Sequence, residues 1–283
     1  MTQTTSAGVP VFGGVSRESN AAARRILDGN LKDLSKDQVI TLASDLFEVV
    51  SVLDSSTPLR RSLTDGSRDA AAKSKLAQDV FAKALSAPAA KLVSELSTLR
   101  WSSPSNLGDV IEQIAIETEA AAANLSNELD LLEQELFDFS RIVVQDGELR
   151  QALNATKFTA ESKRVLVAKI FGGKVSASTA RVIAHLVSGL RGRNIERTIS
   201  FYAAAVAARR ERVIANVQVA VALTDAQKEK LTKTLSEKIG QPVRLNVEIN
   251  PAVLGGFSIR FADELIDASI VSRLADAGRA LAV

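Results

Sequence analysis

Apolar residues follow a helical rhythm along most of the chain and change to a strand rhythm near residue 210. In the helical part they recur at i, i+3, i+4 and i+7, which is typical of one buried helix face. The first such stripe consists of Val39, Leu42, Ala43, Leu46, Phe47 and Val50, and a later one of Leu125, Leu129, Leu132, Leu136 and Phe139. Segments rich in Ser, Pro, Asp and Gly interrupt the rhythm at 54–58, 86–88, 102–106, 144–148 and 171–174, so short packed helices are predicted.

The last 72 residues predict a different module. The stretch "RVIANVQVAVAL" (212–223) alternates with period two and is rich in valine, which indicates a strand. Thr224 is the expected N-cap of a helix over 225–239, which Gly240 closes. A second strand over 243–250, a third region with a turn near Ala262-Asp263 and a final helix over 269–282 complete the order β-α-β-β-α.

The helical part contains an internal repeat. When the chain is shifted by 90 residues without gaps, 13 of the 51 positions from 46 to 96 are identical to their counterparts. "LRRSL" (59–63) falls on "LRQAL" (149–153), Lys73 on Lys163 and Phe81 on Phe171. A shared amphipathic rhythm would not align these polar and aromatic residues in one register. A period of 90 is also too long for a solenoid, so two copies of one small domain are expected.

These patterns predict a mainly α fold with a C-terminal α/β module. We expect a loose tail at 1–15, a first helical bundle at 16–104, a second helical bundle at 105–211 and the small β-α-β-β-α domain at 212–283. Ser103-Pro104-Ser105 is the expected linker between the two copies.

Composition narrows the classes of function. The chain has no cysteine, which excludes disulfides and thiolate chemistry, and His185 is its one histidine. No apolar run reaches the length of a membrane-spanning helix, and the first residues lack the pattern of a secretory signal. The acidic helix at 127–139 is expected to turn its carboxylates to water, and His185 is expected at a polar surface position. No catalytic residue, cofactor site or metal site is therefore predicted.

Two features could still indicate a ligand. Gly255-Gly256 precedes a strand rather than a helix and has no Walker pattern, so a tight turn is favoured over a phosphate cradle. Seven arginines lie within 181–212, at positions 181, 191, 193, 197, 209, 210 and 212. They favour a solvated basic face or a face for an acidic partner. The alternative function is a helical nucleic-acid-binding regulator that uses this basic face.

The C-terminal residues carry a resemblance to a known family. "LTDAQKEKLTKTLSEKIG" followed by a strand and by "NPAVLGGFSIRFADELIDASIVSRL" resembles the delta subunit of the F-type ATP synthase, the family called the oligomycin-sensitivity-conferring protein in mitochondria. The resemblance extends over about residues 106–283. Its signature residues are Pro251, Gly255, Gly256, Phe257, Asp267 and Arg273. The additional first bundle is similar to that of actinobacterial delta subunits, in which this helical domain is duplicated.

The resemblance implies a non-catalytic stator linker of the rotary, proton-translocating ATP synthase. Such a chain joins the alpha subunits of the catalytic head to the b subunit of the peripheral stalk, on the cytoplasmic face of the bacterial plasma membrane. Nucleic acid is not expected as a partner, and contact with the membrane is indirect. In this family an alpha-subunit helix binds between the first and fifth helices of a bundle. The predicted contacts in the second copy are Ile111, Ile114, Ile183 and Val187.

Overall fold

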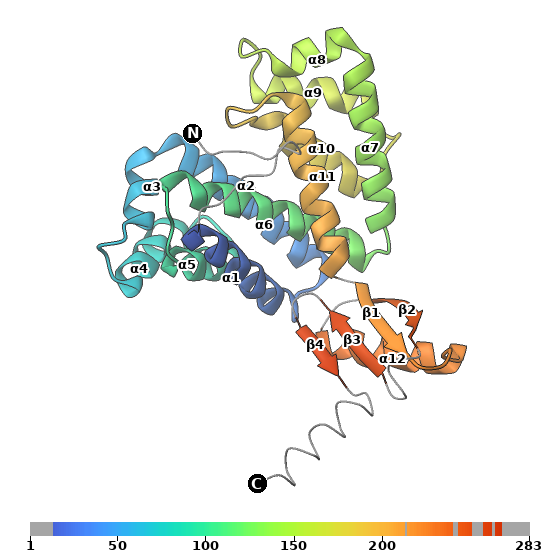
Figure 1. Cartoon of the computed structure of the whole chain (residues 1–283). Helices are drawn as coiled ribbons and strands as arrows, with labels where there is room; N and C mark the ends of the chain where they lie inside the picture. Colours follow the sequence, from blue (N-terminus) through green and yellow to red (C-terminus); the bar gives the residue numbers. More distant parts are fainter. Residues whose placement is uncertain (1–13, 213, 240–242, 251–256, 262–263, 268–283) are drawn as a thin grey trace. The chain divides into compact units, whose positions relative to one another are not determined.

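The computed structural model describes residues 14–212, 214–239, 243–250, 257–261 and 264–267. It divides the chain into two compact units, residues 1–207 and 208–283, and each unit is described by itself. The described residues are mainly helical with one small mixed sheet, as the sequence predicts (Figure 1). Among these residues no helix has the length and apolar character that a membrane span requires.

The helices of the first unit repeat in order, and the third to fifth helices of each set also have the same lengths. The first five are α1 (Gly14–Leu31), α2 (Lys36–Ser55), α3 (Thr57–Thr64), α4 (Ala70–Phe81) and α5 (Ala87–Thr98). The next five are α6 (Pro104–Leu125), α7 (Leu129–Gln145), α8 (Gly147–Asn154), α9 (Ala160–Phe171) and α10 (Ala177–Ser188), and α11 (Ile195–Arg212) follows. A shift of 90 residues places α3, α4 and α5 on the bounds of α8, α9 and α10. These helix bounds therefore repeat at the interval found in the sequence, as two copies of one domain would require.

The same capping contacts also recur at this interval. Ser86 and Ser176 are the N-caps of α5 and α10, and the backbone N–H of each donates to an acid 41 residues earlier. Asp45 of α2 accepts at 2.9 Å in the first copy, and Glu135 of α7 accepts at 3.0 Å in the second. The unpaired N–H groups at a helix start favour a negative charge. Both copies therefore fix their fifth helix to their second helix in one way.

Helix α6 belongs to the cores of both copies. Of the predicted linker, Ser103 caps the start of this helix, and Pro104 and Ser105 lie in its first turn. The helix then packs against α1, α2 and α3 of the first copy and against α7 and α10 of the second. Figure 1 shows α2 and α6 running side by side. Leu107, Val110 and Ile111 of α6 lie in one apolar core with residues of the first copy. The two copies are thus joined through a shared helix inside one compact unit.

The second copy has its own apolar core, formed mainly by one face of α7. The buried residues of this face are Leu129, Leu132, Leu136, Phe139 and Val143. Phe139 meets Phe171 of α9 edge to face, with ring centroids 5.2 Å apart. The stripe predicted from the sequence is confirmed from Leu129 onward, while Leu125 ends the preceding helix.

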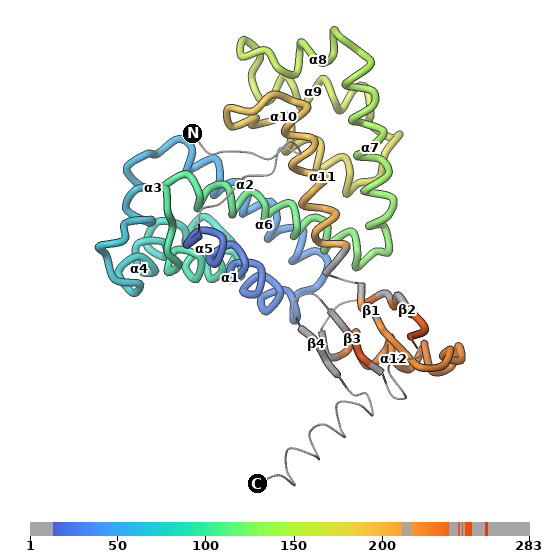
Figure 2. The backbone as a smooth tube through the Cα atoms, viewed as in Figure 1, coloured from blue at the N-terminus to red at the C-terminus, as the bar shows by residue number. Residues whose placement is uncertain are grey.

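The described residues of the second unit form a four-stranded sheet and one helix. Its elements are β1 (Ile214–Val219), α12 (Asp225–Ile239), β2 (Arg244–Ile249), β3 (Phe257–Phe261) and β4 (Glu264–Asp267). The strand order is β2-β1-β3-β4 (Figure 2). Strand β1 is parallel to β2 and antiparallel to β3. Ala215, Val217, Leu235 and Ile259 lie in the core of this unit. The predicted N-cap of α12 is confirmed, because Thr224 and Gln227 form a reciprocal capping box.

The tight turn expected at Gly255-Gly256 lies outside the described residues. Strands β2 and β3 lie on opposite sides of β1 and do not pair with each other. The pairing hairpin is instead β3–β4, in which Ser258 lies opposite Asp267. The alternation of apolar residues identified the strands correctly, but it does not record which strands become neighbours. The predicted final helix over 269–282 lies outside the described residues.

Candidate partner interfaces and the charge network between the copies

The part of the chain where the two copies meet is rich in buried charge. Three glutamates of α6, Glu112, Glu117 and Glu119, are at most 1% exposed. Each pairs with an arginine from another element. Glu117 accepts from Arg24 of α1 at 2.8 Å, and Glu119 pairs with Arg181 of α10 at 3.1 Å. A buried carboxylate is tolerated only when it is paired. Loss of any one of these arginines would therefore destabilise the fold, because a buried charge would be left without a partner.

Arg191 makes the most extensive of these contacts. From the turn between α10 and α11 its guanidinium reaches Asp54 of α2 at 2.8 Å, Asp109 of α6 at 3.2 Å and Glu112 of α6 at 2.8 Å. Arg193 reaches the other oxygen of Glu112. One arginine of the second copy therefore connects the second helix of the first copy to the shared helix. We call this group, Asp54, Asp109, Glu112, Arg191 and Arg193, the arginine clasp.

Backbone geometry directs Arg191 into the clasp. Arg191 has φ 50° and Gly192 has φ 77°, so the turn has two successive residues in the left-handed region. Glycine adopts that conformation without strain, whereas arginine rarely does. On α6 a Cβ atom at Gly108 would lie 2.8 Å from Nη2 of Arg191. The glycine thus leaves room for the guanidinium against the helix.

Burial and pairing shift the pKa values in this region in opposite directions. Burial alone would lower the pKa of Arg191, but Glu112, Asp109 and Asp54 raise it further than burial lowers it. Burial raises the pKa of Asp109 despite the charge of Arg191, and it also raises that of Glu119 despite Arg181. The acids therefore favour the charged form of Arg191, whereas burial favours the protonated forms of Asp109 and Glu119.

Next to the clasp lies a cleft of about 510 Å³ between the copies. Phe47 of α2 stacks on the His185 ring of α10, with centroids 3.9 Å apart, and lies 6.3 Å from the buried Tyr202 ring of α11. The pKa of His185 is lowered to about 4, first by burial and then by Arg164 and Arg181. His185 was expected on the surface. It is instead half-buried in the contact between the copies, because the first copy covers it.

The basic face predicted at 181–212 does not form as a continuous surface. Arg181, Arg191 and Arg193 are paired with acids of α2 and α6, and Arg209 is 0% exposed. Nucleic-acid recognition requires accessible cations. These arginines hold the protein together instead, so the observation that motivated the nucleic-acid alternative no longer supports it.

The four predicted partner contacts are core residues. Ile111 and Ile114 are 0% exposed, Ile183 is 2% exposed and Val187 is 1% exposed. Ile111 and Ile114 pack into the core of the first copy. The structure therefore brings these residues into the interior, where no partner helix can reach them unless covering residues move. The sequence of α6 does contain a sign of this burial. Its apolar residues are too many for one helix face, which indicates a helix covered on more than one side.

Of the signature residues, Phe257 begins β3 opposite Val219, and Asp267 ends β4. Pro251, Gly255, Gly256 and Arg273 lie outside the described residues. Within the described part of the chain no three His, Asp or Glu side chains converge to hold a metal ion. The charged groups of the clasp are engaged in ion pairs, so this arrangement stiffens the contact between α2, α6 and the turn that carries Arg191.

Comparison with known proteins identifies the family. The family model described as ATP synthase delta (OSCP) subunit matches residues 119–281. The ATP synthase subunit delta of Streptomyces avermitilis is 39% identical over 269 residues, which cover 95% of this chain and 98% of the relative. That of Thermobifida fusca is 38% identical, with 95% and 99% covered. The chain belongs to the ATP synthase delta (OSCP) family. It is a structural stator component of the complex rather than a catalytic subunit.

Both curated delta subunits match along nearly their whole length, so the alignments also include the first copy. The family model begins inside α6 and therefore contains only the second copy and the sheet unit. Among solved structures, a chain in the Toxoplasma gondii mitochondrial ATP synthase hexamer is 16% identical and matches 59% of this chain and 97% of its own length. The TM-score of that match is 0.31, which is too low for an argument about the fold.

Proposed function

We propose that this delta-family chain joins the alpha subunits of the ATP synthase head to the b subunits of the peripheral stalk. The helical unit binds the head, and the sheet unit at 208–283 binds the stalk. The observation that carries this proposal is the match to delta subunits over 95% of the chain. The location that follows is the cytoplasmic face of the bacterial plasma membrane, where the chain is held through the complex.

The clasp supports a mechanical role. A stator holds the head against the torque of the rotor, so its parts must not slide past one another. Removing one partner of a buried ion pair costs about 3–5 kcal/mol, because the other charge is left unpaired. Arg191 makes three such contacts between elements that lie 79 to 137 residues apart in sequence. Asp109 and Glu112 lie on the shared helix α6, whereas Asp54 lies on α2, so a motion that moved α2 away from α6 would break the contact of Arg191 with Asp54.

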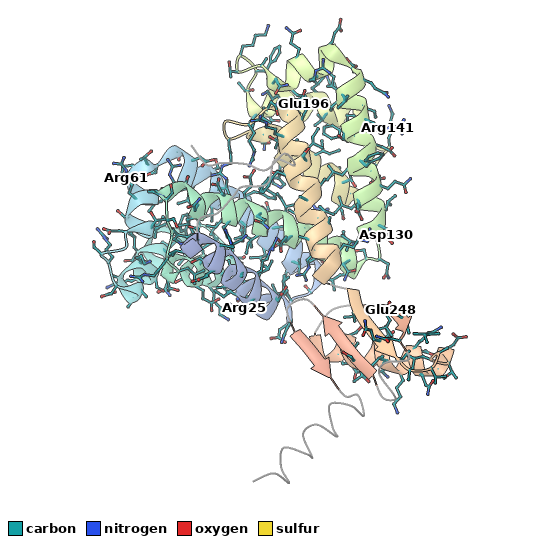
Figure 3. All side chains as sticks on the ribbon, in the orientation of Figure 1. Arg25, Arg61, Asp130, Arg141, Glu196 and Glu248 are labelled. Carbon is teal, nitrogen blue, oxygen red and sulfur yellow. The ribbon has the colours of Figure 1, made fainter. Side chains whose placement is uncertain are left out.

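For the head contact we favour the first copy. The first and fifth helices of the second copy, α6 and α10, turn their predicted contact residues into the core. The same pair in the first copy is α1 and α5, and among the described residues no earlier helix covers α1. Its outer face exposes Ala21 and Arg25, the latter labelled in Figure 3. An alpha-subunit helix therefore has access to this edge.

Calorimetry with two synthetic peptides from the same organism tests the proposal. One peptide carries the N-terminus of the alpha subunit and the other the C-terminus of the b subunit. The full chain is expected to bind both at independent sites, and a chain that ends at Arg212 is expected to bind the alpha peptide only. Ala21→Asp is the matched variant for the α1 edge and should weaken only alpha binding. Undiminished b binding by the shortened chain would refute the assignment of the sheet unit.

A further inference from the structure

The cleft beside the clasp contains a polar group that the fold leaves unused. The cleft has a volume of about 510 Å³, and its walls include α2 of the first copy and α9, α10 and α11 of the second. Tyr202 of α11 lines the cleft and is 1% exposed, yet its hydroxyl forms no hydrogen bond with any described residue. The hydroxyl of a buried tyrosine usually has such a partner, so this one is available to a ligand.

The charged residues around the cleft are paired, with one exception. Arg164 pairs with Glu161 at 2.8 Å, and the nearby Arg181 pairs with Glu119 at 3.1 Å. Three further charged residues of the lining are paired within the clasp, namely Asp54, Glu112 and Arg191. Glu48 of α2 is exposed at the cleft and forms an ion pair with no described residue. The lining therefore has one uncompensated charge, and that charge is negative.

Aromatic rings form another part of the lining. Phe47 stacks on the imidazole of His185, and its ring centroid lies 6.3 Å from that of Tyr202. Burial and the neighbouring arginines lower the pKa of His185 to about 4, so the imidazole is neutral at neutral pH and does not repel a cation. Aromatic rings attract a cation that approaches their faces. The rings and the carboxylate of Glu48 thus favour the same sign of charge in a ligand.

We propose that the cleft binds a small organic ammonium ion, a primary amine with one positive charge and a short aromatic or alkyl tail. The carboxylate of Glu48 and the phenol oxygen of Tyr202 accept hydrogen bonds from the ammonium group, and the tail packs against Phe47. An anion would be repelled by Glu48, and a neutral ligand would gain nothing from its charge. The site goes beyond the proposed stator role and does not depend on it, because all of its groups belong to one chain.

A ligand in the cleft contacts both copies at once. Phe47 and Glu48 lie on α2 of the first copy, whereas Tyr202 lies on α11 of the second. A ligand that binds only the folded arrangement stabilises it by mass action. A bound amine therefore strengthens the same contact between the copies that the clasp holds.

Titration of the full chain with three ligands that share a phenyl ring tests the preference for positive charge. The probes are phenethylammonium, phenethyl alcohol and phenylacetate, which are a cation, a neutral molecule and an anion. His185 is the one histidine of the chain, so the NMR signals of its imidazole protons report on the cleft directly. At neutral pH the ammonium ion should shift these signals to saturation and bind about fivefold more tightly than the alcohol, since the added ion pair is exposed. Phenylacetate should leave the signals unchanged.

Two substitutions separate the charge from the hydroxyl. Glu48→Gln should remove the preference, so that the ammonium ion and the alcohol bind equally. Tyr202→Phe should weaken both of these ligands about fivefold, because each donates to the phenol oxygen. This variant keeps the fold, since the hydroxyl has no partner among the described residues. The matched control is Asp37→Asn, an exposed acid of α2 outside the cleft, which should change no affinity.

Several outcomes would overturn the proposal. Equal affinity of the ammonium ion and the alcohol for the wild-type chain would mean that the cleft is an apolar cavity without charge selection. Tightest binding of phenylacetate would assign the site to Arg164 instead. His185 signals that stay unchanged throughout the ammonium titration would show that the cleft binds no amine, and an unaltered preference in Glu48→Gln would remove this carboxylate from the site.

Discussion

The first and second copies share a scaffold but differ in how their first helices are covered. Helix α1 buries one face, with Ala23, Leu27 and Leu31 inside, and exposes the opposite face at Arg25. Its counterpart α6 is buried on nearly every side, because the first copy packs on the face that α1 leaves open. Duplication has thus converted a surface helix into a central one. The buried glutamates Glu112, Glu117 and Glu119 lie on this central helix.

The same comparison explains the buried charges. The counterparts of Glu112 and Arg191 in the first copy are Ala22 and Trp101, so the first copy has no equivalent of the clasp. Apolar pairs of similar volume often stabilise a core better than ion pairs do. The clasp therefore specifies one arrangement of the two copies, and its largest effects should appear when a single partner is removed.

The largest expected effect is that of Arg191→Met. Methionine keeps much of the side-chain volume but removes the cation shared by Asp54, Asp109 and Glu112. The three acids are then left close together with less compensation, so the free energy of unfolding should fall by about 3–5 kcal/mol. Urea unfolding of the full chain, followed by the helical circular dichroism signal, measures this change.

The matched control is Arg141→Met on α7. Arg141 is 60% exposed and forms an i, i+3 pair with Asp138 at 3.7 Å. An exposed pair of this kind contributes between zero and about 1 kcal/mol. If the two variants were equally stable, the clasp would be no more than a surface feature, and the proposed mechanical coupling of the copies would be wrong.

The contrast between local and distant partners also decides what the sequence could predict. The helices, the duplication and the Thr224 cap follow from spacings of a few residues or from one constant shift. Spacings of this kind can be recognised in the sequence alone. The burial of α6 cannot be recognised in this way. The arginine partners of its glutamates lie 62 to 93 residues away, so no local spacing indicates that these carboxylates are buried and paired. The groove predicted on α6 and α10 stays a prediction, but the burial of Ile111 and Ile114 against the first copy could not be foreseen, since no local pattern places that copy there.

The next largest effect concerns the pH dependence of stability. The pKa of His185 is about 4 in the folded chain, against 6.5 for an ordinary histidine. Between these values the unfolded chain binds a proton that the folded chain does not bind. Stability from this group is therefore complete above pH 6.5 and falls as the pH decreases toward 4. The loss is at most about 3 kcal/mol, because the ring is only partly buried.

His185→Phe should remove this dependence while it keeps the stack on Phe47. Asp109 and Glu119 have raised pKa values, so their contribution has the opposite sign and becomes more favourable as the pH falls. The quantity to measure is thus the difference in unfolding free energy between the wild-type chain and the variant from pH 4 to pH 7. Since His185 is the one histidine of the chain, no other imidazole contributes. A difference that stays constant over this range would show that the ring is not shielded by the first copy.

The smallest effects are expected at the two equivalent capping contacts, in which Asp45 and Glu135 accept from the N–H groups of Ser86 and Ser176. Asp45→Ala removes one acceptor for the Ser86 N–H, and it should cost about 1 kcal/mol. Glu135→Ala should cost more, about 2 kcal/mol, because Glu135 accepts from both the Ser176 N–H and the Thr179 hydroxyl. Asp138→Ala, an exposed acid of the same helix, is the control and should change stability by less than about 0.5 kcal/mol. Urea unfolding of all three variants gives the order. Equal costs for Asp45 and Glu135 would mean that the hydroxyl contact adds nothing, and that the two copies hold their fifth helices with the same strength.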